Sequence, residues 1–444
     1  MRSMLVPLVL SALVLSSRAQ AADDCHVGAY RFASGDIVDI APADDTTLRW
    51  RMFDGTVGTL HPAKDGWTST LGWTDRPDNH QVALPPCARN EIVFDGKTAQ
   101  RIAFDVHDTT FTGRDGVKLT GRLVLPEGTS AVPIVVLVHG SEDTSGVQTY
   151  AMQRLLPAAG VGAFVYDKRG TGTSAGQYTQ DFDVLADDAV AAMREAHRLA
   201  GNRAGRIGYQ GGSQGGWIVP LAANRAPVDF AIVSFGLAVT VLEEDEQEMV
   251  LEMKLKHHTD AEIAKALEIA HAAEALAGDA MAGRAIQETD YAKFDAVRTK
   301  YRNESWFKDV HGNFTYFLLP LNEDQLKAFA AGHAWHTPVH YEPMPTLEAS
   351  TTPQLWILGG DDLQAPSAET SRRITALIDA GKAFTLVLNP DAEHGMTEYE
   401  LDAKGERVST RFSPGYFAMM RDFARDGKLH GTYGRATITR PHHP

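Results

Sequence analysis

The stretch Tyr209-Gln210-Gly211-Gly212-Ser213-Gln214-Gly215-Gly216-Trp217 decides the fold. An apolar run typical of a strand precedes it over 207–209, and a helical pattern follows over 217–223. A serine in G-x-S-x-G at such a strand-to-helix turn is a nucleophile elbow. The turn is so tight that side chains at 211 and 215 would clash, so Gly211 and Gly215 are required there. We therefore predict that Ser213 is a nucleophile in a strained backbone conformation; the alternative is a glycine-rich turn whose serine only caps a helix.

Strand and helix patterns alternate on both sides of this turn. Helices are expected over 184–199, 217–223, 367–378 and 416–423. Continuous apolar runs typical of strands buried on both faces occur at 134–138, 163–166, 207–209, 230–233, 355–358 and 384–388. This alternation indicates an α/β fold with a doubly wound, mostly parallel sheet.

Two regions depart from the alternation and define the domain organisation. Residues 22–112 are rich in Thr, Val, Trp and Phe with frequent turn signals, which favours a small all-β domain. Residues 238–350 are rich in Glu, Ala and Lys, and a helix over 260–277 is expected to begin at Thr259 or Asp260. We interpret 238–350 as a helical cap inserted between two parts of the α/β core, 113–237 and 351–444.

A serine hydroxyl needs a base, and the base needs a third group that orients it. The order expected for this fold is serine, acid, histidine. The loop after the strand at 355–358 contains Asp361 and Asp362, and the spacing from Gly359 to Pro366 favours Asp362. His394 lies in a loop after the last predicted strand, which makes it the candidate base among 17 histidines.

An oxyanion hole needs two backbone N–H donors. The first is expected at Gln214, directly after the nucleophile, and the second at Ser141, in the loop after the strand at 134–138. The loop at 166–174 (Tyr-Asp-Lys-Arg-Gly-Thr-Gly-Thr-Ser) lacks the spacing of a phosphate loop, so we interpret it as a polar loop at the carboxyl edge of the sheet.

Composition and the N-terminal sequence limit the partners and the cellular location to be expected. Its 444 residues carry a net charge of −15, which disfavours nucleic acid as a partner. Residues 1–21 have the positive start, short apolar run and small-residue cleavage site of a signal peptide, so an exported, periplasmic or extracellular protein is expected. The run is too short to span a bilayer core of ~30 Å, and no stable membrane insertion is expected. An oxidising compartment makes a disulfide between Cys25 and Cys87 plausible; the alternative is two free thiols.

Together, five motifs resemble the alpha/beta-hydrolase superfamily. They are His139-Gly140, the 166–174 loop, the elbow at Ser213, the Gly359–Pro366 loop and His394-Gly395. The resemblance implies an eight-stranded core sheet with a cap after the sixth strand. Within the superfamily the chain is similar to secreted bacterial serine carboxylesterases. Many relatives have Gly-Pro where this chain has Glu142-Asp143.

The resemblance implies a serine hydrolase that cleaves a small-molecule acyl ester through an acyl-enzyme, with no metal or organic cofactor. A peptidase, amidase, acyltransferase or thioesterase on the same fold remains an alternative, as does a non-catalytic binding protein. A glutamine rather than a tyrosine after the serine favours esters over peptides. The sequence does not determine the oligomeric state.

Overall fold

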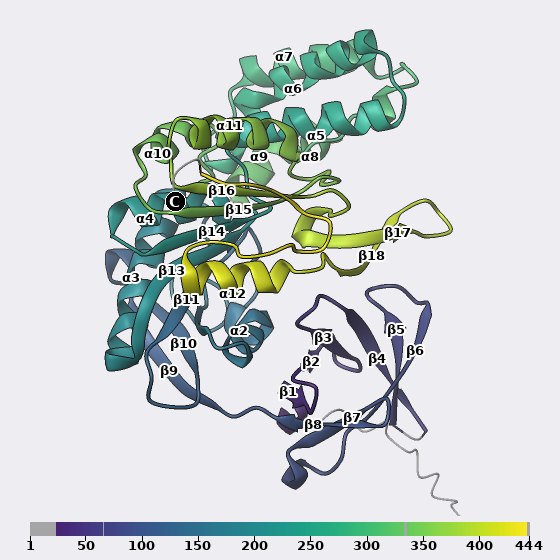
Figure 1. Cartoon of the computed structure of the whole chain (residues 1–444). Coiled ribbons are helices and arrows are strands. Elements are labelled where there is room, and N and C mark those ends of the chain that lie inside the picture. Colours follow the sequence, from purple (N-terminus) through teal and green to yellow (C-terminus); the bar gives the residue numbers. More distant parts are fainter. Residues whose placement is uncertain (1–23, 65, 333–334, 442–444) are drawn as a thin grey trace, which may run out of the picture.

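A computed structural model describes residues 24–441 of the chain except 65, 333 and 334. The predicted signal peptide lies outside the described residues. Two domains and an insertion are visible in Figure 1: a β-barrel at the N-terminus, a large mixed sheet flanked by helices, and a group of helices inserted into the latter.

The N-terminal domain is a closed antiparallel barrel in which each strand pairs with the next and the last pairs with the first. Its core is aromatic: Trp50 is buried with Tyr30 and Phe94, and the Trp50 indole donates to the Ser69 hydroxyl at 2.8 Å. The barrel strands are β1 (Gly28–Phe32), β2 (Ile37–Pro42), β3 (Leu48–Met52), β4 (Val57–Ala63), β5 (Gly66–Leu71), β6 (Pro77–Ala83), β7 (Glu91–Phe94) and β8 (Lys97–Arg101).

The second domain is built on a nine-stranded sheet in the order β19-β16-β15-β14-β13-β11-β12-β10-β9. Strands β11 to β16 run parallel, and β9, β10 and β19 pair antiparallel with their neighbours. The expected eight strands are present, and β19 adds a ninth. The strands are β9 (Phe104–Thr112), β10 (Lys118–Pro126), β11 (Val132–Val138), β12 (Gly162–Tyr166), β13 (Ala204–Gly212), β14 (Phe230–Ser234), β15 (Gln354–Gly359), β16 (Phe384–Asn389) and β19 (Thr437–Thr439).

Helices cover both faces of this sheet. Val136 and Val138 of β11 pack on one face with α3 (Phe182–Ala200), α4 (Gly215–Arg225) and α11 (Ser367–Asp379). Val135 and Leu137 pack on the other face with α2 (Met152–Ala158) and α12 (Tyr416–Asp426). Successive side chains of β11 point alternately into the two cores, which explains why the whole strand is apolar. Helices on both faces of the sheet confirm the predicted doubly wound fold.

The insertion between β14 and β15 is helical. Its first two helices begin with capping boxes, at Thr240 with Glu243 and at Thr259 with Glu262. No helix in the described ranges of the chain has the length and apolar character needed to span a membrane. The cap helices are α5 (Val241–Leu255), α6 (Asp260–Met281), α7 (Glu288–Tyr301), α8 (Thr315–Leu318), α9 (Glu323–Gly332) and α10 (Met344–Ala349).

The boundary between barrel and core differs from the expected one at residue 112. The barrel closes at Arg101, and β9 pairs along its whole length with β10 of the large sheet. β9 is an edge strand whose exposed residues are Asp108, Thr110 and Thr112 besides Val106, so its alternating pattern resembles that of a barrel strand. A buried ion pair also joins the two domains: Arg154 of α2 donates to Asp39 of β2 with an Nη2–Oδ2 distance of 3.1 Å.

Candidate active site

The turn at Ser213 has the strained geometry that its sequence predicts. Ser213 adopts a φ of 52°, a left-handed conformation that is rare for a residue with a side chain. A methyl group at Gly211 would lie 2.8 Å from the Gly215 carbonyl oxygen, and one at Gly215 would lie 3.2 Å from the His139 carbonyl oxygen. β13 therefore turns into α4 over two residues, which projects Ser213 at the carboxyl edge of the sheet.

Asp362 and His394 form a hydrogen-bonded pair. Nδ1 of the imidazole lies 3.0 Å from Asp362 Oδ2 and 3.3 Å from Oδ1. The carboxylate is fully buried and also accepts the Ala365 amide at 2.8 Å, whereas 22% of the His394 side chain is exposed. A buried carboxylate on Nδ1 fixes the proton there and leaves Nε2 free to accept one. Asp361 instead accepts from the Tyr399 hydroxyl at 3.3 Å, so Asp362 is the partner of the imidazole.

Backbone contacts hold the loops of the acid and the histidine together. The Gly360 amide donates to the Asn389 carbonyl at 2.8 Å, and the Asp361 amide donates to the Ala392 carbonyl at 3.0 Å. A methyl group at Gly359 would lie 2.4 Å from the Ala392 carbonyl oxygen, so only glycine allows this approach. The loops after β15 and β16 therefore form one unit that presents the pair.

Phe235 connects this unit to the serine. Its ring packs edge-on against His394 at 4.9 Å between centroids, and it occupies the space that a side chain at Gly212 would need. Among the described residues, no hydrogen bond joins the Ser213 hydroxyl to the imidazole. Hydrogen bonds between a nucleophile and its base are often long before substrate binds.

The loop after β11 lies beside the nucleophile. A methyl group at Gly140 would lie 3.6 Å from Ser213 Cβ. Glu142 fixes this loop, because its carboxylate accepts from the Tyr150 hydroxyl and lies 3.4 Å from His139 Nδ1. Although burial alone would raise it, the pKa of Glu142 is lowered to about 2, chiefly by His139. Glu142 thus anchors this loop through its contacts with Tyr150 and His139.

Lys168 is the second anchor, and the sequence interpretation missed it. Its ammonium group is buried and donates to the Gly140 carbonyl at 2.9 Å, while it lies 4.6 Å from the Tyr178 ring centroid. Tyr178 in turn donates to the Ser141 carbonyl. Burial lowers the pKa of Lys168 to about 8, opposed by Glu142 and Asp143. The signal that could have revealed it is a lysine two residues after a strand buried on both faces.

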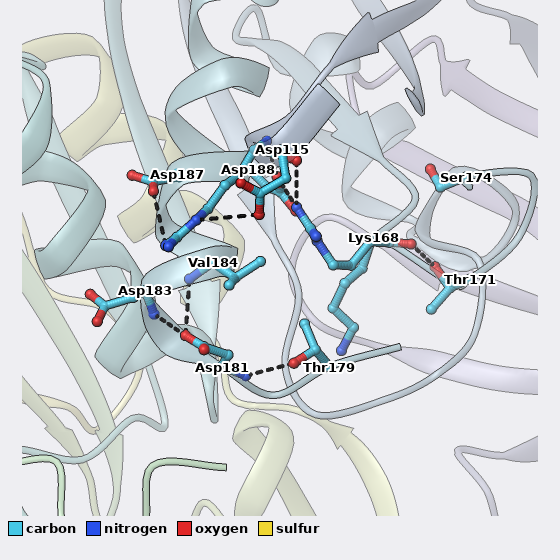
Figure 2. Close-up of polar contacts among 12 residues, drawn as sticks. Asp115, Lys168, Thr171, Ser174, Thr179, Asp181, Asp183, Val184, Asp187 and Asp188 are labelled. Carbon is cyan, nitrogen blue, oxygen red and sulfur yellow. Dashed lines mark hydrogen bonds and ion pairs between the residues drawn. The ribbon is translucent and has the colours of Figure 1, made fainter. Parts of the chain in front are cut away.

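Figure 2 shows the polar contacts that hold the rest of this loop in place. The Thr171 hydroxyl donates to the Lys168 carbonyl at 2.8 Å, and the Lys168 side chain points away from the carboxylates of Asp187 and Asp188. Arg169 binds Asp188 of α3 through two hydrogen bonds of 2.7 and 2.8 Å. The predicted polar loop thus fixes Lys168 between α3 and the loop after β11.

A family model described as serine aminopeptidase, S33, matches residues 129–306, from β11 through the elbow into the cap. The match and the sheet order with an elbow after β13 point to one conclusion. The chain is a member of the alpha/beta-hydrolase superfamily. The matched family is one of serine hydrolases, which agrees with the geometry of this hydrolase around Ser213.

Solved structures similar to this hydrolase include esterases and a peptidase. An esterase from Pyrococcus furiosus is 16% identical, with a TM-score of 0.40 over 66% of this chain and 84% of that one. An esterase from Thermogutta terrifontis is 19% identical, with a TM-score of 0.37 over 65% and 91%. An acylaminoacyl peptidase from Pyrococcus horikoshii is 15% identical, with a TM-score of 0.44. The match covers 89% of this chain and 57% of that one. A search of curated proteins finds no match to the hydrolase.

Two carboxyl groups of the cap helix α5 interact electrostatically with Asp362. Burial, together with the charges of Glu248 and Asp362, raises the pKa of Glu244 well above its usual value. Burial also raises the pKa of Glu248 to about 8, with further contributions from Glu252, Asp245 and Asp362. One Glu248 oxygen is buried without a hydrogen-bond partner. α5 of the hydrolase therefore holds two carboxyl groups whose pKa values are raised by burial and by neighbouring negative charge.

The Glu248 carboxyl predicts a pH-dependent stability. In the unfolded chain it ionises near pH 4.5, but in the folded protein only near pH 8, so stability falls as pH rises through that window. Glu248→Gln is expected to remove this loss, gaining roughly 4 kcal/mol at pH 8 and almost nothing at pH 4. Urea unfolding at both pH values measures it, with the more exposed Glu323→Gln as control. Equal pH slopes for wild type and Glu248→Gln would contradict the prediction.

Other cavities and side-chain clusters of the hydrolase are formed without Ser213, Asp362 or His394. A crevice of about 1460 Å³ lies between the barrel and α12, and none of the triad residues lines it. Two groups bring three potential metal ligands within 4.8 Å. In the first, Cys25 and Cys87 form a disulfide beside His26. In the second, Glu246 and Glu274 lie beside His271, whose side chain is 57% exposed.

Proposed function

We propose that this protein hydrolyses carboxylic esters by a Ser-His-Asp mechanism. The single observation that carries the proposal is the buried Asp362–His394 pair, which packs through Phe235 against Gly212, the residue before Ser213 in the strained elbow. An aspartate or a histidine that only shapes a loop would not require a buried hydrogen bond between carboxylate and imidazole. The combination supports nucleophilic rather than merely structural roles.

In the proposed reaction, the Ser213 oxygen attacks the ester carbonyl while His394 Nε2 takes its proton. Asp362 holds the tautomer and stabilises the imidazolium. The same proton then goes to the leaving alcohol, and the acyl group remains on Ser213. Water, deprotonated by His394, attacks the acyl-enzyme and releases the acid. Both tetrahedral intermediates carry a negative oxygen that needs hydrogen-bond donors.

We assign those donors to the backbone amides of Gln214 and Ser141. Gln214 is buried at the N-terminal end of α4, where the helix dipole also favours negative charge. The carbonyls of Gly140 and Ser141 accept from Lys168 and Tyr178. Those two bonds set the orientation of the peptide units around the Ser141 amide.

Lys168→Met is expected to lower kcat about 100-fold, because the Gly140 peptide loses its only charged donor and the oxyanion loop relaxes. The wild-type enzyme should also lose activity as pH rises through about 8, where the ammonium releases its proton. The variant should lack that step in its pH–rate profile. Lys118→Met, at an exposed lysine bonded to Thr112, is the matched control. A Lys168→Met enzyme with wild-type kcat would remove Lys168 from the oxyanion site.

A peptidase or amidase is the second candidate, because the matched family is described as a serine aminopeptidase. Parallel assays with p-nitrophenyl acyl esters of increasing chain length and with aminoacyl anilides separate the two. We expect ester turnover to exceed anilide turnover. A preference for anilides would replace the esterase proposal, and failure to react with either substrate class or with a fluorophosphonate would favour a binding protein.

We also propose that the protein acts after export, in the periplasm or outside the cell. The leader-like sequence at residues 1–21 supports this, as does the disulfide between Cys25 and Cys87 with its Cα atoms 5.9 Å apart. Disulfides persist in oxidising compartments. Sequencing the N-terminus of the mature protein tests the proposal, with cleavage after Ala21 expected.

A further inference from the structure

A hairpin directly after the catalytic histidine touches the N-terminal barrel. It consists of β17 (Thr397–Leu401) and β18 (Arg407–Phe412), and it begins three residues after His394. In Figure 1 it projects sideways from the core and lies above the barrel. Its position makes it a link between the barrel and the loop that carries the proposed base.

Backbone contacts join the hairpin to two barrel turns. The Trp73 amide donates to the Ser409 carbonyl at 2.9 Å, and the Phe412 amide donates to the Gly55 carbonyl at 2.9 Å. A methyl group at Gly72 would lie 2.5 Å from the Ser409 carbonyl oxygen. Gly72 has a φ of 54°, which favours glycine for a second reason. The barrel turns are thus shaped to admit the hairpin backbone.

Side chains reinforce the same interface. Trp73 packs edge-on against Phe412 at 5.6 Å between ring centroids, and the Arg49 guanidinium lies 4.5 Å from the Trp73 ring. Arg76 binds Glu400 through two hydrogen bonds of 2.7 and 3.2 Å. This ion pair is largely exposed, so it contributes little to stability and can be altered without unfolding the chain.

Ser409 transmits the contact to the histidine loop. While its carbonyl accepts from the barrel, its hydroxyl donates to Glu393 Oε1 at 2.7 Å. Glu393 precedes His394, and its amide donates to the Thr397 carbonyl at 2.8 Å. One residue of the hairpin therefore holds the barrel with its backbone and the neighbour of the catalytic base with its side chain.

The hairpin holds the acid loop as well. Arg407 donates to the Asp361 carbonyl at 2.6 Å, and the Arg407 guanidinium lies 4.1 Å from the Tyr399 ring. The Tyr399 hydroxyl donates to the Asp361 carboxylate. Both loops of the Asp362–His394 pair are thus fixed by the hairpin.

We propose that the N-terminal barrel is an intramolecular buttress that positions His394 through Ser409 and the β17–β18 hairpin. The proposal rests on the proposed function, since it assigns His394 as base. Ser409, Trp73 and Arg76 are positioning residues: none touches the reacting atoms. A displacement of a catalytic group by about 1 Å is enough to cost 100-fold in rate, so a loosened hairpin lowers kcat rather than binding.

The test compares full-length variants in steady-state hydrolysis of a p-nitrophenyl ester, with folding checked by circular dichroism. Ser409→Ala is expected to lower kcat about tenfold with KM within about twofold, whereas Ser409→Thr keeps the hydroxyl and most of the activity. Thr410→Val is the matched control, because the Thr410 hydroxyl donates within the hairpin to Glu398 and not to the histidine loop.

A reciprocal exchange addresses the barrel side. Arg76→Glu should lower kcat several-fold, and adding Glu400→Arg should restore it. Arg89→Glu makes the same charge change in the barrel at a pair internal to it, Arg89–Glu91, and should leave kcat unchanged. Folded Ser409→Ala and Arg76→Glu enzymes with wild-type kcat, or an exchange that restores nothing, would overturn the buttress.

Fluorophosphonate labelling of the wild type separates this result from failure of the proposed function. If the wild type is labelled at Ser213 and hydrolyses the ester, unchanged hairpin variants refute only the role of the barrel. If the wild type neither labels nor hydrolyses, the assignment of His394 as base fails, and the buttress fails with it.

Discussion

Replacing Ser213 by alanine is expected to lower ester hydrolysis by about a million-fold while leaving the fold intact. The hydroxyl is the only atom lost, and no hydrogen bond from it supports its surroundings in the described structure. Its φ of 52° is set by the backbone bond from the Ser213 amide to the Ser234 carbonyl at 3.1 Å, which alanine keeps. Initial rates with a p-nitrophenyl ester measure the effect.

The matched control is Ser34→Ala, at an exposed serine of the barrel that bonds only to Asp36. It should hydrolyse the ester at the wild-type rate. The two variants should also differ towards a fluorophosphonate, which should label Ser34→Ala fully and Ser213→Ala not at all. Substantial turnover by folded Ser213→Ala would place the nucleophile elsewhere.

Asp362→Asn is expected to lower kcat about 10⁴-fold. The asparagine fits the same buried space, but an amide that accepts from Ala365 presents its NH₂ to the imidazole and reverses the required tautomer. Asp361→Asn changes the neighbouring carboxylate, which accepts only from Tyr399, and should stay within a few-fold of wild type. The pair of variants decides between two adjacent aspartates by kinetics. If Asp361→Asn proved the slower enzyme, the orienting role assigned to Asp362 would be wrong.

Much of the α/β core could be predicted because its signals are local. The elbow glycines are required by contacts within a few residues of Ser213, and each buried strand of the parallel sheet is a short continuous apolar run. The order of serine, acid and histidine then follows from the order of the strands. The capping boxes at Thr240 and Thr259 are likewise local signals.

The features that the sequence did not reveal depend on long-range contacts. β9 has an alternating pattern that fits either domain, and only its pairing with β10 assigns it to the core. β19 has three residues and no buried side chain. Lysine is usually a surface residue, so the residue type gives no sign that Lys168 is buried. Its burial depends on contacts with Gly140 and Tyr178, which are distant from it in the sequence. The hairpin after His394 carries partly exposed residues throughout β18, so it has no apolar signature.

The interface between the barrel and the β17–β18 hairpin has a consequence for how the chain folds. Arg76 and Glu400 are 324 residues apart, so closing this contact costs chain entropy that local contacts do not. A chain that emerges from its N-terminus can complete the barrel early, but the support for His394 needs the final tenth of the polypeptide. Catalytic competence should therefore arise in the last stage of folding, and a chain truncated before residue 407 would carry its nucleophile without a functioning base.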